Sequence, residues 1–171
     1  MFYNYKGQFS SVLMAVCDAE LRFTYVSIGS ARIESDGGIF QATEIGKQLL
    51  SGTLPIPQPK TLPQTSTRVA AVLVGDAAFP LLLNLMKPYP VSSLTPEKTI
   101  FNYLQSRARR IIENTFGVLS ARWRILRKRI TVSMSTVDSI VQACVVLHNW
   151  LRDAEHKNVT WPKKKYACRT Y

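Results

Sequence analysis

Three acidic residues stand at positions where a divalent cation could be bound. Asp76 follows an apolar run, Glu113 lies in a long helical pattern, and Asp36 precedes a shorter helical pattern. Carboxylate oxygens are the ligands that Mg²⁺ prefers, and the bound ion usually keeps several waters. Two such ions about 4 Å apart can activate water and stabilise the leaving oxygen in phosphodiester cleavage. The chemistry predicted from these acids is therefore metal-assisted reaction at a phosphodiester.

Each of these acids also has a simpler structural interpretation. An Asp before a helical pattern is a common N-terminal cap, which would account for Asp36. Glu113 is four residues after Arg109 and three after Arg110, so it could pair with either on one helix. An Asp that follows a Gly at a strand end, as Asp76 does, is often a turn residue. The residue types and spacing leave both interpretations open.

The elements around Asp76 predict an α/β fold. Residues 69–80 read VAAVLVGDAAFP, which is typical of a buried central strand that ends at Gly75. Ligand sites of open α/β sheets lie beyond the carboxyl ends of such strands. Residues 9–17 and 21–29 are β-prone runs joined by a three-residue turn, so they predict an antiparallel hairpin. A mixed sheet that presents Asp76 at one rim is expected.

Three helices are predicted to flank this sheet. Residues 39–50 form one pattern that stops at Ser51-Gly52. Residues 100–126 are the longest pattern, and their apolar face consists of Phe101, Ala108, Ile112, Phe116, Leu119 and Trp123. Residues 135–153 form the third, with an expected cap at Ser135 and an apolar stripe of Val137, Ile140, Val141, Cys144, Leu147, His148 and Leu151. Residues 53–68 hold four prolines and predict an exposed connection, and residues 81–98 predict at most a turn or two of helix.

The charge of the chain indicates a polyanionic partner. The 171 residues suit one domain and carry a net charge of +11, and residues 107–129 hold eight basic residues against one acid. Nucleic acid is therefore the first partner to expect, and the family resemblance described below implies DNA. The arginines expected to contact its phosphates lie off the apolar face of the long helix: Arg107, Arg109, Arg110, Arg122 and Arg124. Trp123, His148, Cys17 and Cys144 lie in apolar stretches and are expected to pack in the core.

Other features bear on where the protein acts. No apolar run approaches the roughly 20 residues of a membrane span, and the N-terminus lacks the pattern of a signal peptide, so an intracellular protein without a membrane partner is expected. Pro162-Lys163-Lys164-Lys165 is a candidate nuclear import signal. The nucleus is the expected location, with the cytoplasm as the alternative. The sequence does not indicate an oligomeric state.

A family resemblance covers residues 2–153. The segments YNYKGQFS, AVCDAELRFTYV, SDGGIF, VGDAAFPL, MKPYP, FNYLQSRARRIIENTFGVLSARWRIL and ACVVLHNWL, in this order, resemble the catalytic domain of PIF/Harbinger-type transposases and their domesticated nuclease relatives. The resemblance implies a ribonuclease H-like fold and an Asp-Asp-Glu triad that holds Mg²⁺ or Mn²⁺. Asp76 matches the second Asp of that triad, and Glu113 matches the Glu. Relatives of this kind often act with a Myb-like or SANT partner protein.

The chain departs from the family pattern at its start. The first triad Asp of relatives lies on a first strand upstream of the motif matched by YNYKG, and this chain begins at that motif. Asp36 is a better substitute than Asp18, because the hairpin turn lies at the end of the sheet away from Asp76. We therefore expect a partial nuclease domain over residues 1–153 with impaired catalysis, followed by a basic tail over residues 154–171. The competing hypothesis is a non-catalytic module that binds nucleic acid or protein.

Overall fold

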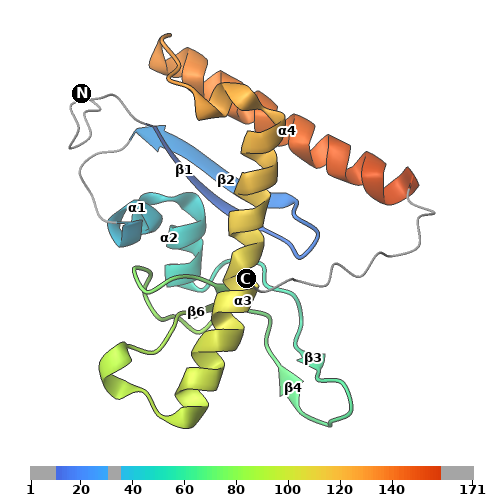
Figure 1. Cartoon of the computed structure of the whole chain (residues 1–171). Coiled ribbons are helices and arrows are strands. Elements are labelled where there is room, and N and C mark those ends of the chain that lie inside the picture. The colour runs from blue at the N-terminus through green and yellow to red at the C-terminus, as the bar shows by residue number, and fades with distance from the viewer. Residues whose placement is uncertain (1–10, 31–35, 159–171) are drawn as a thin grey trace.

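The computed structural model describes residues 11–30 and 36–158 as a mixed α/β fold (Figure 1). Short strands come first in the chain, and two long helices close it. The strands are β1 Ser11–Cys17, β2 Phe23–Ser30, β3 Lys60–Thr61, β4 Arg68–Val69, β5 Leu73–Val74 and β6 Leu85–Met86. The helices are α1 Asp36–Ala42, α2 Glu44–Ser51, η1 Val91–Ser93, α3 Pro96–Arg122, η2 Arg124–Arg127 and α4 Met134–Asn158.

The predicted hairpin is confirmed. β1 and β2 pair antiparallel, from Ser11 opposite Ser30 to Val16 opposite Tyr25, and the register shifts at Cys17. The turn between them contains Leu21 with φ 64°, which is unusual for a residue other than glycine. Such a conformation persists only where the surrounding contacts hold it.

The predicted central strand over residues 69–80 is wrong as one continuous strand. β4 pairs antiparallel with β3 in a small arm, whereas β5 pairs parallel with β6. Val69 and Val72 are exposed, so this segment lacks the packing on both faces that a central strand would have. The break leaves two apolar residues, Leu73 and Val74, to carry the strand that leads to Asp76.

Residues 39–50 form two helices rather than one. Thr43 breaks the pattern, because its hydroxyl donates to the Phe40 carbonyl oxygen at 2.6 Å and accepts from the Gly46 amide at 3.1 Å. The chain is so tight there that a Cβ on Gly46 would lie 1.9 Å from the Phe40 carbonyl oxygen. The predicted stop is confirmed, since Gly52 ends α2 with φ 70°.

The two long helices lie close to their predicted positions. Thr95 caps α3 by accepting from the Lys98 amide at 3.3 Å. At α4 the cap is Ser133, which accepts from the Thr136 amide at 3.3 Å, and not Ser135 as predicted. α4 continues to Asn158, past the boundary predicted at residue 153. The described helices include none that is long and apolar enough to cross a membrane.

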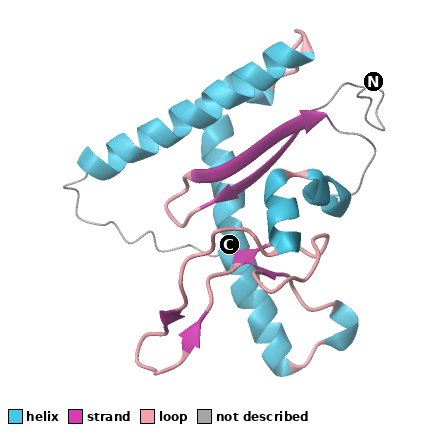
Figure 2. Cartoon of the chain, turned by 180° about the vertical axis from the view of Figure 1, so that it is seen from behind, coloured by secondary structure: helices cyan, strands magenta, loops and turns pink. Residues whose placement is uncertain are grey.

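The hairpin separates two apolar clusters. One face packs against α3 and α4 around Phe23, Leu119, Cys144 and Val145. The other face packs against α1, α2 and β6 around Phe40, Ile45, Leu49 and Leu85. In Figure 2, α3 passes behind the hairpin, which agrees with this layering. The expected core positions of Trp123 and Cys144 are confirmed, but Ala108 and Leu147 are exposed, and Val145 is buried in the core instead.

Candidate functional site

Asp76 closes a turn at the end of β5. Its Oδ1 accepts a hydrogen bond from the Ala78 amide at 2.9 Å, and the side chain is half-buried. The preceding Gly75 is required by packing, because a Cβ there would lie 2.9 Å from the Phe79 ring. The structural interpretation of Asp76 as a turn residue is therefore confirmed. Its second carboxylate oxygen has no hydrogen bond within the described part of the chain.

A buried hydrogen bond ties the end of β5 to α3. The Gln105 side chain is 7% exposed, and its Nε2 donates to the Gly75 carbonyl oxygen. Buried amides need such partners, so this bond fixes the backbone beside Asp76 on the helix. Glu113 lies eight residues further along α3, about 12 Å along the helix axis. The segment that carries Asp76 and the helix that carries Glu113 are thus directly joined.

Glu113 points into solvent and is paired. Its Oε1 lies 2.9 Å from the Arg109 Nη2, one helical turn earlier, and its side chain is 52% exposed. Exposed pairs of this kind contribute little to stability. The structural interpretation of Glu113 as the partner of an arginine is confirmed.

Asp36 is the first residue of α1, and its side chain lies outside the described residues. Within residues 11–30 and 36–158 there is no group of three His, Cys, Asp or Glu side chains placed to hold a metal ion. The described residues therefore do not by themselves form a closed set of metal ligands. Asp76 and Glu113 as metal ligands and catalytic residues, with Asp36 as a further ligand, remain a prediction.

The five arginines selected from the sequence differ in availability. Arg109 pairs with Glu113, and Arg122 pairs with Glu155 of α4. Both arginines therefore already have an acidic partner, although Glu113 is the single acid within residues 107–129. The Arg107 guanidinium lies over the Tyr103 ring at 5.8 Å, and in the described chain Arg110 and Arg124 are exposed without an ion pair.

Three further exposed cations lie just beyond α3. Arg127, Lys128 and Arg129 are exposed, and their side chains have no ion pair within the described chain. They belong to the basic stretch of residues 107–129, but the expected phosphate contacts do not include them, because they fall outside the long helical pattern. The signal that could have found them is the absence of any Asp or Glu from residue 114 to residue 137.

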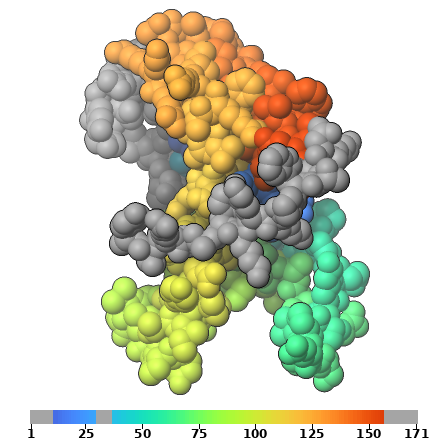
Figure 3. Space-filling view, turned by 45° about the vertical axis from the view of Figure 1, so that its right-hand side comes forward, coloured from blue at the N-terminus to red at the C-terminus, as the bar shows by residue number. Residues whose placement is uncertain are grey.

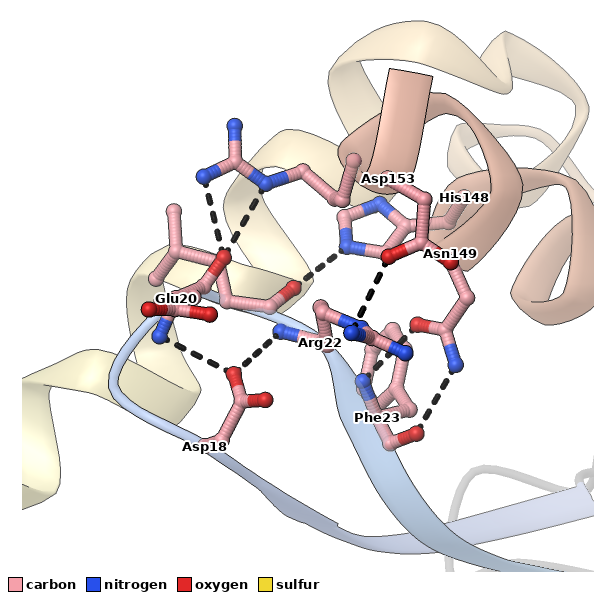
Figure 4. A network of polar contacts seen from close by, with 9 residues as sticks. Asp18, Glu20, Arg22, Phe23, His148, Asn149 and Asp153 are labelled. Carbon is pink, nitrogen blue, oxygen red and sulfur yellow. Dashed lines mark hydrogen bonds and ion pairs between the residues drawn. The ribbon is translucent and has the colours of Figure 1, made fainter. Parts of the chain in front are cut away.

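A polar network fastens the hairpin turn to α4 (Figure 4). Asn149 bonds both backbone groups of Phe23, accepting from its amide at 2.9 Å and donating to its carbonyl oxygen at 2.8 Å. The Arg152 guanidinium donates twice to the Glu20 carbonyl oxygen, and Arg22 pairs with Asp153 at 3.0 Å. These bonds hold the turn that contains the strained Leu21 residue. No periodic signal in the sequence points to Asn149 or Arg152.

His148 is a structural residue of the same network, as predicted. Its ring is fully buried, and Nε2 lies 2.7 Å from the Leu21 carbonyl oxygen, so this nitrogen carries the proton. Burial lowers the pKa of His148 below its usual value, while the hydrogen bond to Leu21 acts in the opposite direction. Arg122 and Arg152 also lower this pKa, and Glu155 raises it. The lowered pKa and the hydrogen bond to a carbonyl oxygen both favour the neutral imidazole, which packs against Leu21 and Phe23 of the hairpin.

Comparison with known proteins gives a consistent family. The DDE superfamily endonuclease family matches residues 1–149. Protein ALP1-like of Arabidopsis thaliana is 28% identical over 88% of the chain and 37% of its own length. Putative nuclease HARBI1 of Homo sapiens is 26% identical over 86% of the chain and 39% of its own length, and the Bos taurus protein of that name matches equally. The chain spans less than two-fifths of the length of each of these relatives.

No solved structure matches the chain significantly. The sequence comparisons therefore carry the assignment, and they agree with the resemblance drawn from the motifs around Asp76 and Glu113. The family match extends over most of the chain and includes the hairpin, β5, α3 and most of α4. The chain belongs to the DDE superfamily endonuclease family and is distantly homologous to the Harbinger-derived nucleases.

Proposed function

We propose that the chain is part of a DNA endonuclease or transposase-derived domain in which Asp76 and Glu113 are two of the carboxylates for Mg²⁺ or Mn²⁺. The observation that carries the proposal is the buried Gln105 bond to Gly75, which holds the Asp76 segment against the helix of Glu113. Family membership supports a nucleic acid substrate and divalent metal chemistry. The bound ion would supply water activation and charge neutralisation at the phosphodiester.

The proposal includes a ribonuclease H-like sheet. α3 contacts both β1 and β5, and α4 contacts both strands of the hairpin, so α3 lies against the hairpin and the β5–β6 pair alike. A cavity of about 630 Å³ lies between the hairpin, α2 and β5, and Val16, Tyr25, Ile45 and Leu73 are among its lining residues. One further strand in this gap would join β1–β2 and β5–β6 into a single sheet. Such a strand would come from outside the described residues, and the first triad Asp belongs on it.

The proposed activity of this chain alone is weak or absent. Asp76 Oδ1 is engaged by Ala78 and Glu113 by Arg109, and no third acid of the described chain completes a site. A two-carboxylate site without its third ligand leaves the ion dependent on phosphate oxygens and water. A nuclear location and a Myb-like or SANT partner protein are part of the same proposal.

A plasmid-nicking assay in Mg²⁺ and in Mn²⁺ tests the activity. The expected result is little or no cleavage by the chain as it stands, and a further loss of any activity in Asp76→Ala and Glu113→Gln. Robust cleavage that Asp76→Ala abolishes would contradict the proposed impairment and support the metal site. Robust cleavage that neither variant reduces would contradict the site itself. The coding sequence upstream of Met1 provides an independent check, since an Asp-containing strand there would complete the triad.

Both acids already have a partner within the chain, and this favours a second candidate function. A non-catalytic module that binds nucleic acid would use Asp76 only as a turn residue and Glu113 only as the partner of Arg109. It predicts DNA binding that is indifferent to Mg²⁺ and to Asp76→Asn, a variant that retains the acceptor for Ala78. A metal-dependent increase in affinity that Asp76→Asn removes would exclude this alternative.

A further inference from the structure

The turn between α3 and α4 presents the densest group of exposed cations in the described chain. Arg124 and Arg127 belong to η2, and Lys128 and Arg129 follow it directly. We define these four residues as the basic corner. None of the four side chains has an ion pair within the described residues. Uncompensated like charges this close repel one another, which costs stability unless an anion binds.

The geometry of η2 orders these cations. A 3₁₀ helix has three residues per turn, so Arg124 and Arg127 project from one edge about 6 Å apart along the axis. Leu126 of η2 and its cap residue Trp123 lie on a different edge, about 120° round the axis, and pack against the cluster of Phe23 and Leu119. The packing of Trp123 and Leu126 therefore fixes the backbone that carries the basic corner. Binding of a ligand does not have to order this backbone, which lowers the entropic cost of binding.

The acids on either side of the basic corner in the sequence are already engaged. Glu113 pairs with Arg109, and Asp138 Oδ1 accepts from the Ser11 hydroxyl at 3.2 Å. Further along α4, Glu155 pairs with both Arg122 and Arg152. The C-terminal dipole of α3 favours cations only within its last turn, where Arg122 lies. Lys128 and Arg129 are beyond that turn. Neither an internal acid nor the helix dipole accounts for the basic corner.

We infer that the basic corner binds the phosphate backbone of duplex DNA, at a place separate from the edge that carries Asp76. Double-stranded DNA presents a phosphate about every 3.4 Å of axis on each strand, so the roughly 6 Å spacing of Arg124 and Arg127 spans about two phosphates. Arginine side chains suit phosphate oxygens because the guanidinium donates in a fork. This inference deepens the proposed function and depends on it only for the identity of the polyanion.

The position of the corner sets a length for the bound DNA. Arg122, the last residue of α3 before the basic corner, is seventeen residues after Gln105, the anchor of the Asp76 segment. This corresponds to about 26 Å along the helix axis. At about 3.4 Å per base pair, a duplex must have about 8 base pairs to reach from one place to the other. Figure 1 shows α3 running as one continuous helix from the bottom of the view, past β6, up to the level of α4.

The test compares two triple variants of the full chain with equal charge. Arg127→Gln/Lys128→Gln/Arg129→Gln removes three of the four cations of the basic corner, and Lys47→Gln/Lys60→Gln/Arg68→Gln removes three exposed cations elsewhere. Both lower the net charge from +11 to +8, because each removes three cations. Binding to a duplex of about 20 base pairs, longer than the span derived above, is measured by fluorescence anisotropy in EDTA over a salt series. Circular dichroism and thermal unfolding confirm that both variants fold like the parent chain.

The expected result is a loss of at least about tenfold in affinity at about 0.1 M salt for the corner variant only. Its slope of log K against log salt should fall by about 2.7, or about 0.9 for each of the three phosphates that the variant no longer neutralises. Equal losses in both variants would overturn the inference, because net charge alone would then explain binding. An unchanged affinity of the corner variant for the duplex would also overturn the inference. The same variants are tested on phosphatidylserine vesicles, and a loss of binding to the vesicles but not to the duplex would overturn it too. Failure of the Asp76→Ala cleavage test would leave this measurement unaffected, since EDTA excludes metal.

Discussion

The two halves of α3 lie in very different surroundings. In the C-terminal half, Leu119 is 2% exposed and packs with Phe23 of the hairpin. In the N-terminal half, Ile100, Tyr103 and Leu104 are all more than half exposed. Figure 3 shows the start of α3 and the β3–β4 arm projecting as separate lobes. The apolar side chains of α3 are thus buried in a core at the C-terminal end of the helix and largely exposed at the N-terminal end.

This difference indicates which part of the protein is complete in itself. The hairpin, the C-terminal half of α3 and α4 share one apolar cluster and the polar network of His148 and Asn149. The β5–β6 pair has two residues per strand and is tied to α3 by Gln105. Two-stranded sheets of this size are not stable alone, so the Asp76 side depends on further contacts.

The largest expected contrast concerns two leucines on α3. Leu119→Ala should reduce the free energy of unfolding by about 3 kcal/mol, because it leaves a cavity in the cluster of Phe23. Leu104→Ala, at a side chain that is 54% exposed, should change it by less than about 0.5 kcal/mol. Urea unfolding followed by circular dichroism measures both. Equal effects would show that the N-terminal half is covered in solution.

The polar network should give the next largest effect. Asn149→Ala removes both hydrogen bonds to the Phe23 backbone and should cost about 1–3 kcal/mol. Gln142→Ala, at an exposed position of the same helix, is the control and should be nearly neutral. Chemical denaturation provides the measurement. An effect of Asn149→Ala no greater than that of the control would mean that the network does not hold the hairpin.

His148 should make the hairpin side sensitive to acid. Its pKa is lowered in the folded state, so the unfolded chain binds the proton more readily. The stability it contributes is present above its unfolded pKa of about 6.5 and is lost as the pH falls through the folded value. We expect a smaller effect than that of Asn149→Ala, because the hydrogen bond to Leu21 opposes the effect of burial. Thermal unfolding between about pH 7.5 and 5.5 should show a decline that His148→Gln reduces.

The smallest expected effect concerns the exposed pair beside the candidate metal site. Arg109→Gln removes the partner of Glu113 and should cost only about 0.2–0.5 kcal/mol. Arg110→Gln, an exposed residue in the same turn, is the matched control. Differential scanning calorimetry of the two variants gives the comparison. A loss above about 1 kcal/mol would show that Glu113 is fixed as a structural partner, which would weaken its assignment as a metal ligand.

Some elements could be predicted because their signals are local. The hairpin follows from two β-prone runs with a short turn, and α3 follows from apolar residues at helical spacing, Ile112, Phe116, Leu119 and Trp123 among them. The structural roles of His148 and Trp123 follow from their places in apolar stripes. The central strand could not be predicted correctly, because a buried strand needs neighbours on both edges. The apolar run contains no information about whether those neighbours are present.

The sequence by itself determined the family, the long helices and the strong positive charge of this protein, since these depend on motif order, local periodicity and composition. Only the tertiary structure decided which charges are available. It paired Arg122 with Glu155, thirty-three residues away, and left Arg127, Lys128 and Arg129 exposed. The physical reason is that an ion pair depends on the distance between side chains in space. The packing of α4 against α3 and the hairpin sets that distance.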